Sequence, residues 1–487
     1  MASPARTRTS THQTKRVTDS FENALSLFHE TSQRVPAYKD FLRKAKIRPD
    51  RIKTLSDFAH IPPTDKQNYI LTYDLQDLSW DGTLDGTKYI SSSSGSTGTP
   101  LYWPRGDVQG DAAGRISQRV YENIFDTKHG TTLCINLFGL GTWIAGLEFY
   151  NAAKYVADHG NRISIATPGI EKEVAIDTIK RLAPSFDRIV LMGYPPFIKD
   201  VLETCAAEGI EWPTYDVRLL TGGESFSERW RDRVLTLIGK PHSLTHVINA
   251  YGMAESGIIG HETPLSLLAR RASPSIPTLA ERFAYEGTTA ALYQYDPRLR
   301  YFEVGHNDTL ILTTRAGLPL VRYNTRDQGG IIAHGDMATH LASLSVPAPN
   351  LLRATPWRLP FVYLYGRRDL SISFYALNIY VENVKYAFET CAASHQLSGL
   401  FVMQIEHTRD LDQRFTITAE LGREAQPHPT LTREVTTHLV RALRSVNTEY
   451  AKLHASIGQR AVPKVRMVRY GEIDTFPGRK HRWIKRV

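Results

Sequence analysis

The chain contains 487 residues, of which 41% are hydrophobic and 22% are charged. This is the composition of an ordinary folded protein, and it excludes disordered, collagen-like and fibrous chains. At about 150 residues per domain, the length accommodates several domains, or one large domain with a smaller one. Lysine and arginine (59) outnumber aspartate and glutamate (50), and the net charge of +9 favours anionic ligands such as nucleotides. No nucleic-acid-binding motif accompanies this charge, so nucleic acid is not an expected partner.

The longest stretch without an ionised side chain other than histidine is 130–147. It is shorter than the roughly 20 residues that span a bilayer, so no membrane span is expected. Cys134, Cys205 and Cys391 are odd in number and far apart, which argues against a disulfide framework or a Cys-x-x-Cys zinc site and favours a reducing cytoplasm. Residues 1–16 hold basic side chains but no acid and no apolar run, and predict a flexible basic tail rather than a secretory signal.

The helical spacing of apolar residues over 17–42 predicts an N-terminal helical layer. Beyond residue 88, short β-rich runs alternate with longer amphipathic segments. The expected strands are 89–91, 131–136, 163–166, 188–192, 217–220 and 246–250, and the expected helices are 173–182, 196–207 and 227–237. This alternation predicts an α/β architecture with a mostly parallel sheet, whose ligand crevice lies at the carboxyl ends of the strands.

The pattern changes over 309–323 to short strands joined by turns, which predicts a β subdomain within the large domain. Four prolines within 343–360 mark an irregular connection. A small α+β domain is expected after it, with helices at 379–389 and 431–443 and strands at 400–405, 415–420 and 465–468. The expected division is a tail at 1–16, a large domain at 17–365 and a small domain at 366–487.

A glycine-punctuated loop rich in hydroxyl groups directly follows the first expected strand. Glycines let the backbone approach an anion closely, and serine and threonine hydroxyls add donors for phosphate oxygens. The loop is not a Walker A motif, because Gly98 is followed by Thr99 and Pro100. A flexible Ser/Gly linker is the alternative interpretation. The candidate phosphate-binding residues are Ser94, Gly95, Ser96, Thr97, Gly98 and Thr99.

Two further strand ends carry aromatic and acidic side chains. Tyr251 and Glu255 follow the strand expected to end at residue 250, where the ring is suited to stack on a nucleotide base and the carboxylate to hold Mg²⁺ against phosphates. Asp327 follows another apolar run and is suited to accept hydrogen bonds from ribose hydroxyls. For each residue taken alone, ordinary turn chemistry is the alternative.

Taken together and in this order, these segments resemble the motifs of the adenylate-forming enzymes, most closely those of the phenylacetate–coenzyme A ligase branch. Residues 94–100 are similar to the family's phosphate loop, and 251–255 match its Tyr-Gly-x-x-Glu motif, whose Tyr packs on adenine and whose Glu serves the metal. Residues 322–327 resemble an Arg-Tyr-x-Thr-x-Asp segment, which gives Asp327 the ribose role. The Gly222, Gly223 and Glu224 turn looks like the family's Gly-Ala-Glu turn beside the adenine.

The resemblance extends from about residue 36 to the C-terminus and includes a hinge and a terminal motif. Residues 366–369 (Gly-Arg-Arg-Asp) resemble the family's hinge, which makes Asp369 the pivot of the small lid domain and Arg367 a nucleotide contact. The family's terminal motif carries a Gly-Lys pair, whereas here Arg479 separates the glycine from Lys480. Lys480 is the catalytic lysine that the resemblance implies, and Arg479 remains the alternative.

The resemblance implies ATP-dependent conversion of a small-molecule carboxylic acid to an acyl-adenylate with release of pyrophosphate. The acyl group then passes to the thiol of coenzyme A or of a carrier protein, or to an amine. Lys480 and Glu255 are the implied catalytic residues, with ATP and Mg²⁺ as cofactors. The candidates for the acid pocket are Phe138, Gly139, Trp143 and Gly222. The two rings favour an aromatic or apolar acid, and glycine-enabled core packing is the alternative.

The family usually has a glycine where this chain has Ala376, in a loop that lines the pantetheine tunnel of coenzyme A ligases. This departure puts thioester formation in question. Together with Arg479, it motivates an alternative function, that of an ATP-binding family member that has lost ligase chemistry and acts as a regulatory or scaffold protein. The sequence leaves the acid, the acceptor and the oligomeric state open.

Overall fold

The computed structural model describes residues 8–93, 101–141, 144–285, 288–341, 355–367, 371–422, 424–473 and 483–485. These residues form two compact units, of which the larger takes in almost everything up to Gly366 and the smaller consists mainly of the residues from Arg367 onward. No helix in these ranges is both long and apolar enough to cross a membrane. The three cysteines are buried and form no disulfide.

The N-terminal part of the large unit is helical within the described residues, with α1 (Arg8–Arg34), α2 (Pro36–Lys44), α3 (Leu55–Ala59) and α4 (Leu75–Leu78). Helix α1 begins inside the segment that the sequence assigned to a tail. The predicted helical stretch is divided at Val35 because Pro36 lacks an amide hydrogen and restricts the preceding residue to extended backbone. The rings of Phe21 and Phe28 both pack edge-on against Phe58 and hold α1 to α3.

An 11-stranded sheet forms the centre of the large unit, in the order β12-β13-β14-β15-β11-β8-β7-β6-β5-β3-β4 among the described residues. Its parallel half contains β3 (Thr132–Leu137), β4 (Ile163–Ala166), β5 (Arg188–Gly193), β6 (Val217–Gly222) and β7 (Val247–Met253). Every residue of β3 and β5 is buried, as expected for strands covered on both faces.

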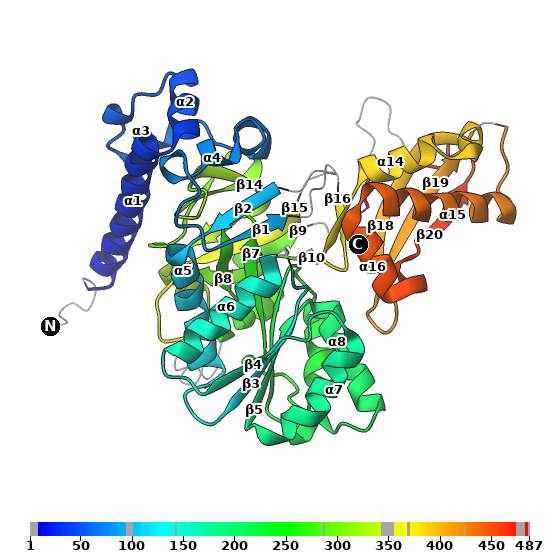
Figure 1. Cartoon of the computed structure of the whole chain (residues 1–487), viewed down its shortest axis with the longest axis horizontal. Helices are drawn as coiled ribbons and strands as arrows, with labels where there is room; N and C mark the ends of the chain where they lie inside the picture. Colours follow the sequence, from blue (N-terminus) through cyan, green and yellow to red (C-terminus); the bar gives the residue numbers. More distant parts are fainter. Residues whose placement is uncertain are drawn as a thin grey trace. The chain divides into compact units, whose positions relative to one another are not determined.

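Helices cover the parallel strands on either side, as Figure 1 shows for α6 and for the pair α7 and α8. The helices of this region are α5 (Asp107–Arg119), α6 (Ile144–Asp158), α7 (Lys172–Leu182), α8 (Pro195–Ala207) and α9 (Glu228–Leu237). Helix α8 starts at a proline, and α9 starts where the Ser227 hydroxyl accepts a hydrogen bond from the Trp230 amide. These local signals explain why the bounds predicted from the sequence for both helices agree closely with those of the structure.

The other half of the sheet is built from antiparallel pairs: β7–β8, β8–β11, β11–β15, β12–β13 and β13–β14. Its strands are β8 (Gly257–His261), β11 (Ala291–Tyr295), β12 (Tyr301–Val304), β13 (Thr309–Thr314), β14 (Leu320–Ile332) and β15 (Phe361–Arg367). The β subdomain expected from 309–323 therefore continues the main sheet. The remaining elements are β1 (Tyr89–Ser93), β2 (Leu101–Arg105), β9 (Ala284–Tyr285), β10 (Thr288–Thr289), α10 (Pro264–Ala272), α11 (Pro277–Phe283) and α12 (His334–Leu341).

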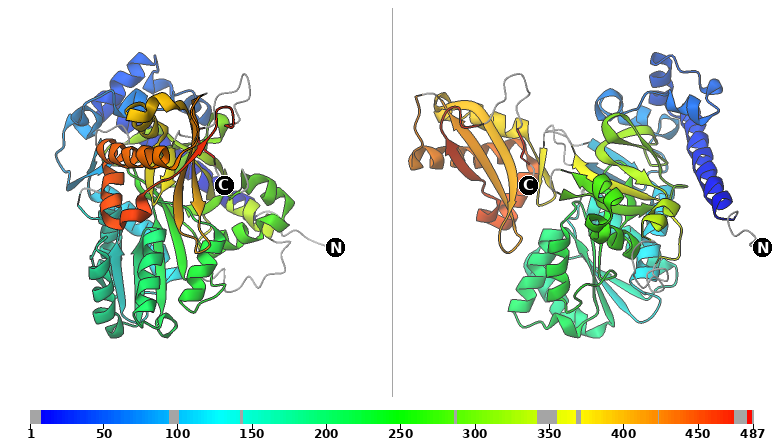
Figure 2. Two further views of the ribbon diagram at one scale, coloured as in Figure 1. Left: turned by 90° about the vertical axis from the view of Figure 1, so that its right-hand side faces the viewer. Right: turned by 180° about the vertical axis from the view of Figure 1, so that it is seen from behind.

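The small unit contains a hairpin, a three-stranded sheet and helices on one face of that sheet. Figure 1 shows the helices in front of the strands, and the right-hand view of Figure 2 shows the strands from the opposite side. The elements are β16 (Ser371–Phe374), β17 (Leu377–Tyr380), β18 (Leu397–His407), β19 (Gln413–Leu421), β20 (Lys464–Val468), α14 (Val381–Glu389), α15 (Pro429–Val446) and α16 (Thr448–Ile457). Side chains from both layers, including Phe401, Ile417 and Leu439, form the core.

The predicted α/β fold class is confirmed: a large sheet with a long parallel run is accompanied by a smaller α+β unit. The helix predicted at 379–389 begins later, at Val381. Residues 377–380 form β17 because Ile379 pairs with Ile372, and Tyr380 with Ser371, in the β16–β17 hairpin. Pairing with a neighbouring strand overrides the helical preference of these residues.

Candidate active site

Phe138, Gly222, Tyr251 and Glu255 lie at or just beyond the carboxyl ends of parallel strands, whereas Asp327 lies on the antiparallel strand β14. The strand pairing sets Leu137 of β3 opposite Gly193 of β5 and Gly193 opposite Thr221 of β6. Gly222 of β6 lies opposite Ala250 of β7. The segments that follow β3, β6 and β7 therefore leave the sheet at one edge, where open α/β sheets bind ligands.

The turn after β6 requires glycine at two positions. Gly223 has a φ of +92°, which residues other than glycine rarely adopt. A Cβ atom on Gly222 would lie 3.0 Å from Cζ of Phe149, so glycine allows that ring to lie against the strand end. The side-chain amide of Asn249 donates a hydrogen bond of 3.0 Å to the Glu224 carbonyl oxygen and fixes the end of the turn.

Asn249 is held by a buried network beneath the turn. Its Oδ1 accepts a hydrogen bond of 3.0 Å from the Thr221 hydroxyl, and its backbone amide donates one of 2.8 Å to Glu262 Oε2. Glu262 Oε1 lies 2.7 Å from Nη2 of the fully buried Arg231. Burial raises the pKa of Glu262, and the guanidinium of Arg231 acts against that shift. This pairing makes a buried carboxylate tolerable and leaves the Asn249 amide in a fixed orientation.

Tyr251 and Asp327 come together across the sheet. The Tyr251 hydroxyl, at the end of β7, donates a hydrogen bond of 2.6 Å to Asp327 Oδ2 on β14. The backbone amide of Asp327 donates to the Thr325 hydroxyl oxygen at 3.2 Å, which restrains the carboxylate. On the other side, the Tyr251 ring packs against Tyr293, with 5.6 Å between ring centroids. The sequence assigned both Tyr251 and Asp327 to the nucleotide, and the structure places them side by side.

Glu255 lies in the turn between β7 and β8 and is half-buried. The Tyr323 hydroxyl of β14 donates a hydrogen bond of 3.2 Å to Glu255 Oε1. Within the described ranges, no group of three or more His, Cys, Asp or Glu side chains is placed to hold a metal. A single accessible carboxylate suits Mg²⁺, which commonly binds through one or two carboxylates together with substrate phosphates and water.

Strand β14 is bent where it carries these residues. Arg322 and Arg326 have φ values of 47° and 63°, and each directly precedes a site residue, Tyr323 or Asp327. The Arg322 guanidinium compensates for the strained backbone: it donates to Glu303 Oε2 at 3.0 Å, to the Ala59 carbonyl oxygen at 2.6 Å and to that of Ile61. The N-terminal helical layer thereby supports the bend.

The structure places Phe138 in the core, whereas the sequence suggested it for the acid pocket. Its ring is fully buried in the core, 4.4 Å from the Phe149 ring and 5.1 Å from the Tyr194 ring between centroids. Gly139 is also buried, and its carbonyl oxygen leaves no room for a side chain on Gly146. Tight packing accounts for both residues, so any contact of Phe138 with an acid needs a change in this packing.

Several predicted residues lie outside the described residues: Ser94, Gly95, Ser96, Thr97, Gly98, Thr99, Trp143, Asp369, Arg479 and Lys480. Arg367 ends β15, but its side chain is likewise outside the description. Downstream of Lys480, residues Trp483 to Lys485 are attached to β18 by two backbone hydrogen bonds with Met403, of 2.8 and 2.9 Å. The Trp483 ring packs on Phe401 at 4.7 Å between centroids.

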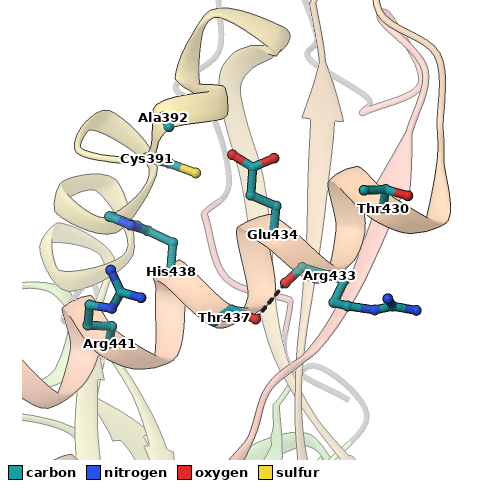
Figure 3. Close-up of a pocket in the computed structure, with 8 residues that line it drawn as sticks. All are labelled: Cys391, Ala392, Thr430, Arg433, Glu434, Thr437, His438 and Arg441. Carbon is teal, nitrogen blue, oxygen red and sulfur yellow. Dashed lines mark hydrogen bonds between the residues drawn. The ribbon is translucent and has the colours of Figure 1, made fainter.

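An open groove of about 400 Å³ lies in the small unit, beside α15 and the end of α14 (Figure 3). His438 points across it toward Cys391, and its Nε2 lies 3.0 Å from the Thr390 hydroxyl oxygen. Glu434 and Arg441 also line the groove. It contains none of the predicted site residues, and its charged side chains belong to the solvated face of α15.

The sequence analysis missed buried charged residues that surround the site: Arg105, Glu148, Arg231, Glu262 and Arg300. None of them belongs to a motif used there. Arg105 lies at the end of a strand, and Glu148 lies within an apolar helix. A charged residue among apolar neighbours was the sequence signal that could have identified them.

No protein-family model matches the sequence, and no curated protein matches it. Among solved structures, the chain is similar to 2-hydroxyisobutyryl-CoA ligase crystallised with 2-HIB-AMP and CoA in its thioesterification state. The TM-score is 0.62 at 14% identity, covering 100% of this chain and 94% of that chain. An open conformation of the same ligase gives a TM-score of 0.55 at 14% identity, covering 100% of this chain and 96% of that one. The protein has the fold of the adenylate-forming enzymes.

Proposed function

We propose that this protein is an AMP-forming carboxylate ligase, which uses ATP to convert a carboxylic acid to an acyl-adenylate and then transfers the acyl group to a thiol or an amine. One observation carries the proposal: the hydrogen bond from Tyr251 to Asp327 lies in the same strand-end cluster as the one from Tyr323 to Glu255. Strand β7 thus supplies an aromatic ring, β14 a carboxylate for ribose, and the turn after β7 a carboxylate for a metal.

In this proposal the nucleoside of ATP binds beside the turn after β6. The Tyr251 ring packs on the adenine, whose edge faces the backbone of Gly223 and Glu224. Asp327 accepts hydrogen bonds from the ribose hydroxyls, and the Tyr251 hydroxyl holds its carboxylate in place. The hydroxyls and amides of the loop 94–99 bind the phosphates, and Arg367 is a further nucleotide contact.

Glu255 is the residue that would hold Mg²⁺ in this site. When bound, the ion neutralises phosphate charge and stabilises the charge that develops on the departing pyrophosphate. The hydrogen bond from the Tyr323 hydroxyl to Oε1 restrains this carboxylate. Preorganised charges of this kind supply most of the stabilisation in phosphoryl and adenylyl transfer.

The first half-reaction joins two anions. An oxygen of the acid attacks the α-phosphorus of ATP, a new oxygen–phosphorus bond forms, and the bond to the pyrophosphate oxygen breaks. We assign to Lys480 the role of the cation that offsets the accumulating charge. Rotation about Asp369 would bring Lys480 to the phosphates and later remove it.

The second half-reaction replaces AMP by the acceptor. A thiol or amine attacks the acyl carbon, AMP leaves with the electron pair of the bond to carbon, and the acceptor loses its proton to solvent or a base. Coenzyme A is the acceptor that fits the fold best, since the similar ligase was crystallised with CoA. At the position where a glycine is usual, Ala376 has a φ of 63°, so the backbone keeps the conformation that a glycine would adopt there.

The finer assignment to a phenylacetate–coenzyme A ligase-like enzyme acting on an aromatic or apolar acid is part of the proposal. It is supported by the resemblance of the sequence motifs and by the Phe149 ring, which lies against Gly222 and makes the end of β6 apolar. Trp143 and Gly139 are the further residues proposed for the acid pocket.

The test is exchange of labelled pyrophosphate into ATP, measured with Mg²⁺ over a panel of aliphatic and aromatic acids. We expect exchange that depends on one class of acid, followed by consumption of the adenylate when coenzyme A or an amine is added. A folded protein that binds ATP but exchanges no pyrophosphate with any acid would contradict the proposal.

A further inference from the structure

Arg105 is a buried cation that lies between two parts of the candidate site. It ends β2, and only 1% of its surface is exposed. Its Nε donates to the Ser91 hydroxyl oxygen at 3.3 Å, on β1, shortly before the loop 94–99. Its Nη2 donates to the carbonyl oxygen of Ala254, the residue before Glu255. One guanidinium thus joins the strand before the predicted phosphate loop to the turn that carries the predicted metal ligand.

The same turn is held by two further buried charged side chains. Arg300, 1% exposed, donates from Nη2 to the carbonyl oxygens of Ile258 at 2.9 Å and Ser256 at 3.3 Å. Glu148 Oε1 accepts a hydrogen bond of 3.1 Å from the Ile258 amide. Gly257 has a φ of +74°, and any side chain on it would collide with the Glu148 carboxylate. The backbone on both sides of Glu255 is therefore fixed by charged groups rather than by apolar packing.

Charges are unusually concentrated here. Burial lowers the pKa of Arg105, and the neighbouring charges of Glu148 and Glu255 oppose that shift. Burial likewise lowers the pKa of Arg300, to about 10. Among the described residues, Nη1 of Arg105 is buried and has no hydrogen-bond partner. A buried cation with an unused donor is costly, and the fold is expected to retain one only where the charge serves a purpose.

We infer that Arg105 is a positioning residue for Glu255, which couples the strand leading into the phosphate loop to the turn that presents the metal-binding carboxylate. This inference rests on the proposed function. Residues that orient a metal ligand without touching the metal typically change metal affinity or activity by about 10 to 100-fold when they are replaced. The expected consequence of losing Arg105 is weaker metal binding with the nucleotide and acid contacts still in place.

The test compares three variants. Arg105→Met removes the charge at similar length, and Arg105→Lys keeps the charge but cannot bond Ser91 and Ala254 at once. Arg119→Met is the matched control: Arg119 donates to Asp296 Oδ2 at 2.6 Å elsewhere in the large unit, and Asp296 keeps Arg298 as a second partner.

Two quantities are measured: the Mg²⁺ dependence of ATP–pyrophosphate exchange, and Mn²⁺ binding to the protein–ATP complex by electron paramagnetic resonance, which needs no turnover. We expect Arg105→Met to weaken both metal affinities by about 10 to 100-fold, with a smaller change in KM for the acid. Arg105→Lys should lie between that variant and the wild type, and Arg119→Met should match the wild type.

A folded Arg105→Met with wild-type metal affinities would overturn the inference while leaving the proposed function intact. If Arg105→Met does not fold, the test rests on Arg105→Lys. Unchanged metal affinities in Arg105→Lys would then overturn the inference. A wild-type protein with neither exchange nor metal binding would overturn the proposed function, and this inference with it.

Discussion

The Tyr251 hydroxyl and the Asp327 carboxylate are joined by a hydrogen bond of 2.6 Å, although the two residues are 76 positions apart in the chain. The bond links β7 of the parallel half of the sheet to β14 of the antiparallel half. Both side chains are largely buried, so the bond fixes the orientation of a carboxylate that water does not fully solvate. The carboxylate that this bond orients is the one proposed to accept hydrogen bonds from ribose.

Tyr251→Phe keeps the ring and removes only this hydroxyl. We expect KM for ATP to rise about threefold to tenfold, because a hydrogen bond to a charged group contributes about 1.5 to 3 kcal/mol and part of that is recovered by solvent. Tyr251→Ala should cost more, since the ring is lost as well. The measurement is the ATP dependence of pyrophosphate exchange. If Tyr251→Phe and the wild type have equal KM values for ATP, the Tyr251 hydroxyl does not orient Asp327 for nucleotide binding.

Glu255→Gln tests the proposed metal ligand with almost no change in shape. Exchange should fall by about 10² to 10³-fold, since one preorganised charge is lost from the site of reaction. Thermal stability should change little, because the side chain is only half-buried. Glu281→Gln, an exposed glutamate on α11, is the matched control and should retain full exchange. Substantial exchange by Glu255→Gln at ordinary Mg²⁺ concentration would exclude the metal role.

Lys480 and Arg479 are separated by alanine substitution. Lys480→Ala should lower exchange by about 10² to 10³-fold, because it removes the cation that offsets charge in the transition state. Arg479→Ala should leave exchange near the wild-type rate. Lys485→Ala, a nearby lysine in the segment attached to β18, controls for loss of positive charge at this end of the chain. The opposite pattern would assign the catalytic cation to Arg479.

Ala376→Gly should stabilise the small unit. Tyr375 and Ala376 connect β16 to β17 in a two-residue turn, and their φ values are 48° and 63°. The left-handed conformation costs an alanine roughly 1 kcal/mol relative to glycine, and the greater freedom of glycine in the unfolded chain recovers part of the difference. We expect a gain of about 0.5 kcal/mol in the free energy of unfolding, measured with urea. A loss of stability would mean that the alanine methyl group makes a packing contact.

His261 makes stability depend on pH. Burial lowers its pKa from 6.5 to about 4 in the folded protein, and its Nδ1 lies 2.8 Å from the Glu262 carbonyl oxygen. The unfolded chain binds a proton near pH 6.5 and the folded chain only near pH 4, so stability falls as the pH drops through this window. The loss reaches roughly 3 kcal/mol below pH 4. His261→Gln should flatten the dependence of the unfolding free energy on pH between pH 6.5 and 4. If the slope is unchanged, other titrating groups cause the pH dependence.

The fold class could be predicted from the sequence because its signals are local. Tyr251 and Glu255 follow an apolar run at the end of a parallel strand, whereas Asp327 lies on the antiparallel strand β14 and meets Tyr251 only through the tertiary fold. The β16–β17 hairpin was missed because Ile379 is held by pairing with Ile372, a contact outside any helical periodicity.

The supporting residues could not be predicted in the same way. Arg105 reaches Ala254 across 149 positions, and Glu148 reaches Ile258 across 110. Such partners are fixed by tertiary packing, and neither periodicity nor composition carries information about them. The ring of Phe138, an aromatic residue at a strand end, is buried in the core, and its role in the acid pocket stays a prediction.

The bend of β14 has a consequence for the order of assembly. Arg322 bonds the carbonyl oxygen of Ala59, 263 positions earlier, so two distant stretches must meet before the strand can adopt its final path. At 5–20 residues per second, a ribosome needs on the order of tens of seconds to make the intervening polypeptide. During that interval the leading helices emerge without the arginine that later holds them, so the N-terminal helical layer gains this support only after residue 322 has been made.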